Sequence, residues 1–362
     1  MDIQLLLNKA INFEFLSVDE GVFLYKKAPL NELMYIANKI RFKHNPEPKV
    51  SWIIDRNINI SNICFVKCKF CNFCRSPNHQ EAYITSTEEY ITKINELKKW
   101  GGNQILLQGG LNPSNDLNFY VQLFKTLKKL FPEIKLHALS PPEIIHICKI
   151  SKKNIEFVLE KLILAGLDSL PGGGAEILSD RVRKIISPAK CSSKEWLKVM
   201  QVAHKLNITT TATMMFGHIE TIEERIMHLI KIRDIQSLKP PQAKGFISFT
   251  CWPFQNKNTR LEKELGPFKA ISKEEYLRTM AIARIILCNI PNIQASWLTM
   301  GYETAQLCLH AGANDLGSVM MEENVVSSAG ISKVKLYPEE MEKIIITAGF
   351  TPIKRNQQYE FE

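Results

Sequence analysis

The sequence predicts an α/β protein built on a (β/α)8 barrel, in which eight strands alternate with helices. Three observations predict this fold. From about residue 56, short β-prone runs and segments of helical periodicity alternate eight times. Several of the helical segments begin with the spacing of a capping box, Ser or Thr followed three residues later by Glu. Finally, the 362 residues are 45% hydrophobic and 23% charged, a balance that supplies enough apolar material for one large barrel.

The predicted strands are short runs rich in β-branched and aromatic residues, bounded by polar or glycine-containing loops. They lie at 56–63, 103–108, 134–139, 167–170, 208–216, 245–252, 292–297 and around 313–316. Ser86, Ser192, Thr221 and Ser272 each stand three residues before a glutamate, and four of the helices are expected to begin there. An open, doubly wound sheet shows the same alternation of elements and is the alternative fold.

Two helical segments are expected to flank the barrel. Residues 1–50 form a predicted helical extension that ends at the proline-containing break 45–48, and the barrel is expected to span 51–330. In the remaining segment, 331–362, a helix is predicted to begin near Pro338 and to end near Gly349.

The bulk composition excludes several classes of protein. The net charge is +9, but the basic residues are scattered, and no basic stripe interleaved with aromatic residues predicts nucleic-acid binding. The nine cysteines form no regular framework of disulfides. The N-terminus lacks the basic region of a signal peptide, and no uncharged apolar run reaches the roughly 18 residues of a membrane span. We therefore expect a soluble, cytoplasmic protein with no membrane span and no nucleic-acid partner.

A cluster of cysteines follows the first predicted strand. Cys64, Cys68 and Cys71 are spaced so that one loop can wrap a face of a cubic 4Fe–4S cluster. Three thiolates leave one iron without a protein ligand, and that iron can bind the amino and carboxylate groups of S-adenosylmethionine (SAM). The CxxxCxxC spacing is the signature of radical SAM proteins, whose cluster cleaves SAM to a 5′-deoxyadenosyl radical. Zinc binding and chance clustering are the alternatives.

Cys74 extends this run by one further cysteine. A fourth thiolate would close the cluster and turn it into an electron-transfer centre to which SAM cannot bind. The order of the spacings, x3, x2 and x2, does not match the ferredoxin order of x2, x2 and x3. We therefore interpret Cys74 as a bystander and predict a three-cysteine site.

The remaining candidate residues lie at the ends of predicted strands, where a barrel gathers its chemistry. Glycine turns after the second and fourth strands let the backbone approach a ligand closely, and nearby charged groups can pair with the ribose, ammonium or carboxylate of SAM. The predicted SAM-binding residues are Gln108, Gly109, Gly110, Gly173, Glu176 and Arg181. A tight turn, a flexible loop and a surface charge are the corresponding structural alternatives. The predicted substrate-contacting residues are His137, Gln294, Trp297 and Asn314.

Seven segments between about residues 50 and 330 resemble the radical SAM family of dehypoxanthine futalosine cyclases. They are 64–71 (CFVKCKFC), 104–111 (QILLQGGL), 137–143 (HALSPPE), 168–176 (DSLPGGGAE), 213–218 (TMMFGH), 294–297 (QASW) and 312–317 (GANDLG). The cysteine spacing belongs to the whole superfamily, whereas the later segments point to its futalosine and deazaflavin branch. The triple glycine at 172–174, together with 213–218, favours the cyclase.

The resemblance implies a reaction in the futalosine route to menaquinone. The 5′-deoxyadenosyl radical takes hydrogen from C4′ of the ribose of dehypoxanthine futalosine, and the carbon radical adds to the benzoate ring to form a spiro carbocycle. Loss of one electron and one proton then restores aromaticity. Such a reaction needs a base, for which His218, Glu220 and Asp315 are the candidates. It also implies a 4Fe–4S cluster and SAM as cofactors, and an electron donor such as flavodoxin or ferredoxin.

Other functions predict different observations. A sister radical SAM enzyme, either an aminofutalosine synthase or a deazaflavin-forming synthase, would share the fold and yield a different product. An iron–sulfur electron carrier would use four cysteines and form no 5′-deoxyadenosine. A zinc-stabilised RNA-binding protein would be colourless, and its affinity for RNA would fall steeply with salt.

Overall fold

All ten strands in the part of the chain that the computed structural model describes, residues 1–324 and 335–361, belong to one parallel sheet. The strand order is β10-β1-β9-β8-β7-β6-β5-β4-β3-β2. The strands are β1 (Lys49–Ile53), β2 (Asp55–Asn59), β3 (Gln104–Gln108), β4 (Lys135–Ala138), β5 (Ser169–Leu170), β6 (Thr209–Phe216), β7 (Phe246–Pro253), β8 (Asn292–Gln294), β9 (Asp315–Ser318) and β10 (Thr351–Lys354).

The two halves of residues 49–59 join the ends of this sheet. Only Ile54 separates β1 from β2, so the two strands follow one another along one stretch of chain. The first half pairs with β9, with Ser51 opposite Asp315, and the second half pairs with β3, with Asp55 opposite Gln104. Eight strand positions therefore form a closed ring. This confirms the predicted barrel and excludes the doubly wound sheet, in which the last strand does not return to the first.

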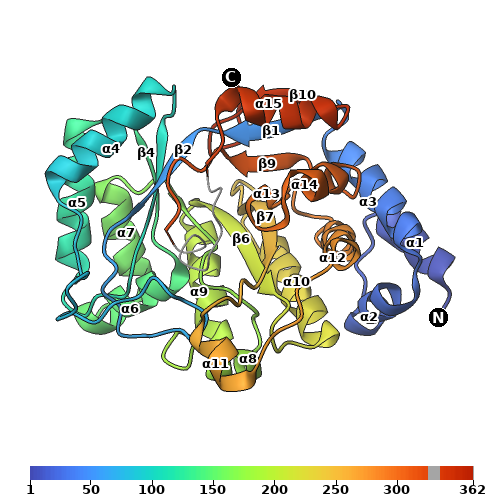
Figure 1. The fold of residues 1–362 in the computed structure, drawn as a ribbon, viewed down its shortest axis with the longest axis horizontal. Helices are drawn as coiled ribbons and strands as arrows, with labels where there is room; N and C mark the ends of the chain where they lie inside the picture. Colours follow the sequence, from blue (N-terminus) through green and yellow to red (C-terminus); the bar gives the residue numbers. More distant parts are fainter. Residues whose placement is uncertain (325–334, 362) are drawn as a thin grey trace.

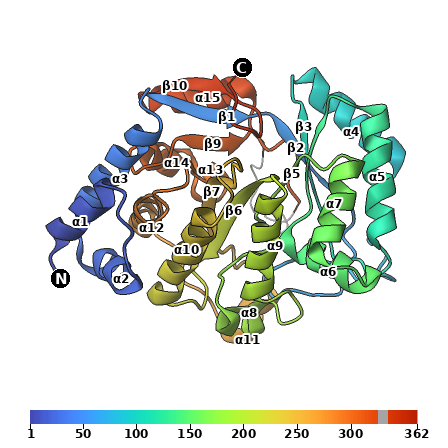
Figure 2. The ribbon, with the colours of Figure 1, turned by 180° about the vertical axis from the view of Figure 1, so that it is seen from behind.

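Helices cover the outside of the ring (Figures 1 and 2). They are α4 (Thr87–Lys99), α5 (Leu117–Leu130), α6 (Pro141–Ser151), α7 (Ile155–Ala165), α8 (Asp180–Ile186), α9 (Ser193–Lys205), α10 (Ile222–Ser237), α11 (Arg260–Leu265), α12 (Lys273–Ile286), α13 (Trp297–Met300), α14 (Tyr302–Leu309) and α15 (Pro338–Thr347). The main core lies between the sheet and these helices. Along β3, for example, Ile105 and Leu107 are fully buried on the helix side, whereas Leu106 and Gln108 face the lumen.

Three of the four predicted capping boxes are confirmed, at Ser86, Ser192 and Thr221. At the fourth, the Ser272 hydroxyl accepts a hydrogen bond from the backbone N–H of Glu275, but the Glu275 carboxylate does not bond back to Ser272. It turns instead towards the buried guanidinium of Arg225, at 2.7 Å. A buried cation thus takes the carboxylate away from the helix end.

The N-terminal helices α1 (Ile3–Ile11), α2 (Val18–Lys27) and α3 (Leu30–His44) lie on one side of the barrel, as both views show (Figures 1 and 2). There α3 packs along α12, and α2 packs along α10 and α12. No helix in the described part of the chain is long and apolar enough to cross a membrane.

The C-terminal part contains more than the predicted helix. Helix α15 begins at Pro338 as expected, but the chain continues into β10, which pairs in parallel with β1 and was not predicted. The predicted strand 292–297 ends early, at Gln294, and Trp297 begins α13 instead. The predicted boundary between residues 330 and 331 lies outside the described residues, so the domain limits stay a prediction.

Candidate active site

The lumen of the barrel contains a cavity of about 400 Å³. Barrels of this kind are usually filled by large branched apolar side chains. Here the inward positions of two long strands carry small hydroxyl residues instead: Thr211 and Thr213 of β6 lie opposite Ser248 and Thr250 of β7. Their small volume leaves the middle of the barrel open, and their hydroxyls make its wall polar.

The predicted cluster loop leaves β2 at the C-terminal end of the barrel. Within it, Lys67 adopts a left-handed conformation (φ 50°), and the backbone N–H of Cys71 donates to the carbonyl of Cys68, at 3.1 Å. Both turns fold the loop back on itself. The loop is anchored where the N–H of Lys69 donates to the carbonyl of Ile186 in α8, at 2.8 Å. Its three cysteines are therefore carried by a tethered turn, as a cluster loop requires.

The donor set fits a 4Fe–4S cluster better than a single metal ion. Among residues 1–324 and 335–361, no three His, Cys, Asp or Glu side chains are grouped so that they could hold one ion. A cubic cluster does not need such convergence, because its irons occupy separate corners and each takes one thiolate. The Cys74 sulfur lies 3.4 Å from the carbonyl oxygen of Cys64 and also contacts the Cys64 thiol, so it is close to the predicted ligands.

The glycine turn after β3 supports the cysteine loop. A Cβ atom on Gly110 would overlap the carbonyl oxygen of Ile63 and crowd Cys64, so only glycine fits there. The N–H of Gly109 donates to the buried carboxyl of Glu143, at 3.1 Å, and the N–H of Ser140 donates to the same carboxyl, at 2.6 Å. Burial raises the pKa of Glu143 to about 7. Three residues of this turn were predicted to bind SAM. Gln108 lines the cavity, whereas Gly109 and Gly110 are not among the residues that line it.

The glycine turn after β5 lies at the same end of the cavity, two strands away from β3. Gly173 and Glu176, which were predicted to bind SAM, both line the cavity, and a Cβ atom on Gly173 would lie close to the side-chain amide of Gln108. Glu176 has a left-handed backbone (φ 47°), and its carboxylate pairs with the nearly buried Lys190, at 2.9 Å. The residues predicted to bind SAM on the two turns therefore face one another.

Arg181 does not belong to this group. It lies half-exposed at the start of α8, where its guanidinium pairs with Glu224 at the N-terminus of α10. The neighbouring Arg183 is buried and donates to the carbonyl oxygens of Gly174 and Ala175, at 3.1 and 2.6 Å. Arg183 thus holds the glycine turn in place. Arg181, by contrast, is a surface charge, which was the structural alternative to its predicted role in binding SAM.

Two of the predicted substrate-contacting residues line the cavity, and the other two lie outside it. His137 and Gln294 line the cavity. Trp297 is buried behind the wall, where its indole N–H donates to the carbonyl of Ser318, at 3.0 Å. Asn314 is also buried outside the cavity, and its side-chain oxygen accepts a hydrogen bond from Arg284, at 2.9 Å. Both of these residues are part of the packing of the barrel.

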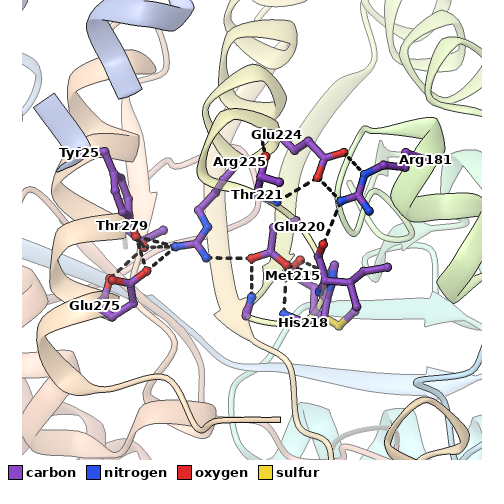
Figure 3. A network of polar contacts seen from close by, with 12 residues as sticks. Tyr25, Arg181, Met215, His218, Glu220, Thr221, Glu224, Arg225, Glu275 and Thr279 are labelled. Carbon is purple, nitrogen blue, oxygen red and sulfur yellow. Dashed lines mark hydrogen bonds and ion pairs between the residues drawn. The ribbon is translucent and has the colours of Figure 1, made fainter. Parts of the chain in front are cut away.

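His218 and Glu220, two of the candidate bases, lie outside the cavity in a buried network (Figure 3). Glu220 accepts hydrogen bonds from the N–H groups of Gly217 and His218 and pairs with Arg225, at 2.8 Å. Although burial raises it, the neighbouring His218 and Arg225 hold the pKa of Glu220 below its usual value. The His218 ring is 3.1 Å from the carbonyl oxygen of Met215. The network fixes the loop after β6, and this position does not support a proton transfer to a ligand in the lumen.

Asp315, the third candidate base, is fully buried at the N-terminal end of β9. Its carboxylate accepts two hydrogen bonds from Arg355, at 2.6 and 3.0 Å, and others from Ser51 and from the N–H of Gly317. These four donors fix the position of the carboxylate. Its position at the opposite end from the cysteine loop was not expected.

Several residues of the cavity were not predicted. Asp55 and Asn57 of β2 line it, as do Arg355 and Gln357, which follow β10. The hydroxyls of β6 and β7 could have been found from the alternation of Thr and Ser in the predicted strands. No comparable pattern marks the C-terminal residues, because they reach the lumen only through the tertiary fold.

Comparisons with known proteins agree with this geometry. A model of the radical SAM superfamily matches residues 58–231, and a model of the CofH/MqnC C-terminal region matches residues 243–362. The cyclic dehypoxanthine futalosine synthase of Halalkalibacterium halodurans is 40% identical over 360 residues, covering 99% of this chain and 95% of that protein. The 5-amino-6-(D-ribitylamino)uracil–L-tyrosine 4-hydroxyphenyl transferase of Methanopyrus kandleri is 38% identical, covering 95% of this chain and 93% of that protein.

The crystal structure of methylornithine synthase (PylB) has the same fold, with a TM-score of 0.73 over 96% of this chain and 97% of that one, at 19% identity. The barrel, the cysteine loop and the family matches together define a radical SAM enzyme, whose cofactors are a 4Fe–4S cluster and SAM. Within that class, the chain belongs to the CofH/MqnC family, as the resemblance to the futalosine cyclases predicted.

Proposed function

We propose that this enzyme converts dehypoxanthine futalosine into cyclic dehypoxanthinylfutalosine in menaquinone biosynthesis. The observation that carries the proposal is the 40% identity to the Halalkalibacterium halodurans synthase, which extends over 99% of the chain. It includes both the radical SAM part and the C-terminal part that completes the cavity.

The C-terminal end of the lumen is the cofactor end. Cys64, Cys68 and Cys71 would hold the cluster, and the two glycine turns place Gln108, Gly173 and Glu176 at the same end of the lumen to take SAM. When bound, the cluster and SAM supply the 5′-deoxyadenosyl radical. Gln108 and Glu176 line that end of the lumen and offer an amide and a carboxylate to the polar groups of SAM. Gly173 has no side chain, so SAM can approach its backbone closely.

The middle of the lumen holds the substrate. Its wall offers neutral hydrogen-bonding groups to the ribose hydroxyls, among them Thr213, Thr250 and Gln294. Apolar side chains, including Leu106, Met215 and Leu298, provide surface for the aromatic ring. Enclosing the substrate within a barrel keeps water and stray hydrogen donors away from a carbon radical.

The function is tested by an anaerobic assay of the reduced holoenzyme with SAM and dehypoxanthine futalosine, followed by mass spectrometry. The proposal expects 5′-deoxyadenosine in stoichiometric amount and a product two hydrogens lighter than the substrate. Formation of 5′-deoxyadenosine without that product would contradict the substrate and leave the radical SAM class intact.

The second candidate is the hydroxyphenyl transfer, which the 38% identity to the Methanopyrus kandleri transferase favours. It is tested in the same assay by replacing dehypoxanthine futalosine with 5-amino-6-(D-ribitylamino)uracil and L-tyrosine. A coupled product with these two substrates, and none with dehypoxanthine futalosine, would assign the transferase.

We also propose that a flavodoxin or ferredoxin supplies the electron to the cluster. The outer side of the cysteine loop presents an exposed aromatic residue, Phe65, and an exposed cation, Lys67. An acidic electron carrier can approach the cluster over this side. Reduced flavodoxin should support turnover, and Lys67→Glu should lower that rate while leaving the rate with dithionite unchanged; equal rates with flavodoxin would contradict the proposal.

A further inference from the structure

The C-terminal tail closes the end of the lumen that lies opposite the cysteine loop. After β10, residues 355–358 cross beneath the barrel and bond to four of its strands. Arg355 pairs with Asp315 of β9 and donates its backbone N–H to the carbonyl of Trp52 in β1. Gln357 accepts a hydrogen bond from Gln104 of β3, at 3.1 Å. Gln358 accepts one from Thr209 of β6, at 2.7 Å. The tail is thus the floor of the cavity.

Arg355 brings a cation into the cavity. Among the described residues that line the cavity, it is the one lysine or arginine. Its Nε and one terminal nitrogen donate to Asp315, and the other terminal nitrogen donates to the carbonyl of Asn356, at 3.1 Å. A guanidinium has five N–H groups, so one N–H on each terminal nitrogen is left over from these contacts. One N–H on each of the two terminal nitrogens can form a two-pronged edge that donates to both oxygens of a second carboxylate.

The surroundings of Arg355 do not oppose a second anion strongly. The Asp315 carboxylate accepts four hydrogen bonds, and two of them come from Ser51 and Gly317 rather than from Arg355. Asp55 is the other acidic group close to Arg355 on the floor, and burial raises its pKa, which favours the uncharged acid. His137 is neutral, since burial lowers its pKa to about 3. Its Nε2 lies 3.4 Å from the amide nitrogen of Gln357.

We propose that the tail forms a carboxylate subsite, in which Arg355 and the side-chain amide of Gln357 bind the carboxylate of the substrate. This inference rests on the proposed function, because it places the benzoate carboxylate of dehypoxanthine futalosine on the floor and its ribose towards the cysteine loop. The alternative substrate, L-tyrosine, also carries a carboxylate, so the same chemistry has two possible sources. Arg355 and Gln357 are then part of the binding site, whereas Gln358 lies outside the cavity and only anchors the tail to Thr209.

The subsite is tested by isothermal titration of the anaerobic holoenzyme, with SAM present and the cluster unreduced. The ligands are dehypoxanthine futalosine and its carboxamide analogue. Replacing the carboxylate by the amide should weaken binding to the wild type about thirty-fold, because a charge-assisted pair is lost. Gln357→Leu should weaken binding of the carboxylate about ten-fold and affect the carboxamide less.

The matched control is Gln358→Leu, which removes the same side chain one position further along the tail, outside the cavity. It should bind dehypoxanthine futalosine as the wild type does. Arg355→Lys keeps the charge and loses the two-pronged edge, so it should weaken the carboxylate selectively if it folds, as checked by circular dichroism. If that variant does not fold, the affinities of the wild type and of Gln357→Leu for the two ligands still test whether the subsite exists.

The outcomes separate the subsite from the function. Equal affinity for carboxylate and carboxamide on the wild type, or equal effects of Gln357→Leu and Gln358→Leu, would overturn the subsite. If the wild type does not bind dehypoxanthine futalosine, the proposed function fails, and the same comparison is made with L-tyrosine and its amide. A preference for L-tyrosine over its amide, lost in Gln357→Leu, would support the subsite with the other carboxylate source.

Discussion

The two ends of the lumen are built in different ways. At the cysteine end, the three proposed cluster ligands come from one loop and two glycine turns each follow one strand, so each part is contained in a short stretch of sequence. At the floor, Asp55, His137, Asp315, Arg355 and Gln357 come from β2, β4, β9 and the tail, and they meet only when the barrel has closed. The chemistry shared by a superfamily thus resides in local motifs, whereas the recognition of a particular substrate depends on long-range contacts.

The largest effect is expected at the cysteine end. Cys71→Ser removes one of three cluster ligands and should abolish both the bound iron and the formation of 5′-deoxyadenosine. Cys74→Ser, three residues further on, should leave iron content and activity largely intact. Iron analysis and the anaerobic assay check both variants, and loss of the cluster in Cys74→Ser would contradict the three-ligand site.

At the floor, the largest effect is expected from Asp315→Asn. The change leaves the buried guanidinium of Arg355 without its anionic partner and should lower the free energy of unfolding by about 3–5 kcal/mol. Urea unfolding measures it. Glu133→Gln, which removes an exposed ion pair with Lys98, is the control and should leave the free energy of unfolding unchanged. Similar effects of the two substitutions would show that the floor is not held by this pair.

A smaller loss is expected from Glu143→Ala at the cysteine end. It removes the acceptor of the backbone N–H groups of Gly109 and Ser140 and should cost about 2 kcal/mol of unfolding free energy. Because Gly109 belongs to the turn that supports the cysteine loop, the variant should also lose its cluster faster on exposure to air. Measuring the bleaching of the iron–sulfur absorbance checks this, and an unchanged bleaching rate would separate Glu143 from the cluster end.

The effect that is smallest for each unit of pH concerns His137, at the floor of the lumen. Burial depresses the pKa of His137 from 6.5 to about 3, so the unfolded chain takes up a proton before the folded one does. The contribution of the neutral ring is therefore complete above 6.5 and is lost as the pH falls towards 3. His137→Gln should flatten the slope of unfolding free energy against pH in this window by up to about 1.4 kcal/mol per pH unit. An unchanged slope would mean that His137 is protonated in the folded protein.

The sequence predicted the barrel and one end of the site, but it did not predict β1, which closes the ring by pairing with β9. All eight predicted strands are present, and Cys64, Gly110 and Gly173 lie where their motifs placed them relative to the barrel. Alternation within a strand was harder to use. His137 and Gln294 face the lumen, whereas Trp297 begins a helix and points behind the wall, because its strand ends three residues earlier than predicted.

The rest of the site required the tertiary structure. His218 and Glu220 follow a strand end, as catalytic residues often do, but Arg225, held by Tyr25 and Glu275 from distant parts of the chain, draws Glu220 into a structural network (Figure 3). Asp315 was predicted at the wrong end of its strand, because the strand begins at this residue rather than before it. Arg355 and Gln357 carry no pattern at all, since only the crossing of the tail beneath the barrel brings them to the lumen.

The central claim is that the lumen presents the ribose of dehypoxanthine futalosine to the cofactor end of a radical SAM barrel. Its most direct test is turnover of substrate labelled with deuterium at C4′, followed by mass spectrometry of the 5′-deoxyadenosine. The account predicts 5′-deoxyadenosine that is one mass unit heavier than with unlabelled substrate. Unlabelled 5′-deoxyadenosine, formed together with the cyclised product, would show that hydrogen is taken from another position and would contradict the account.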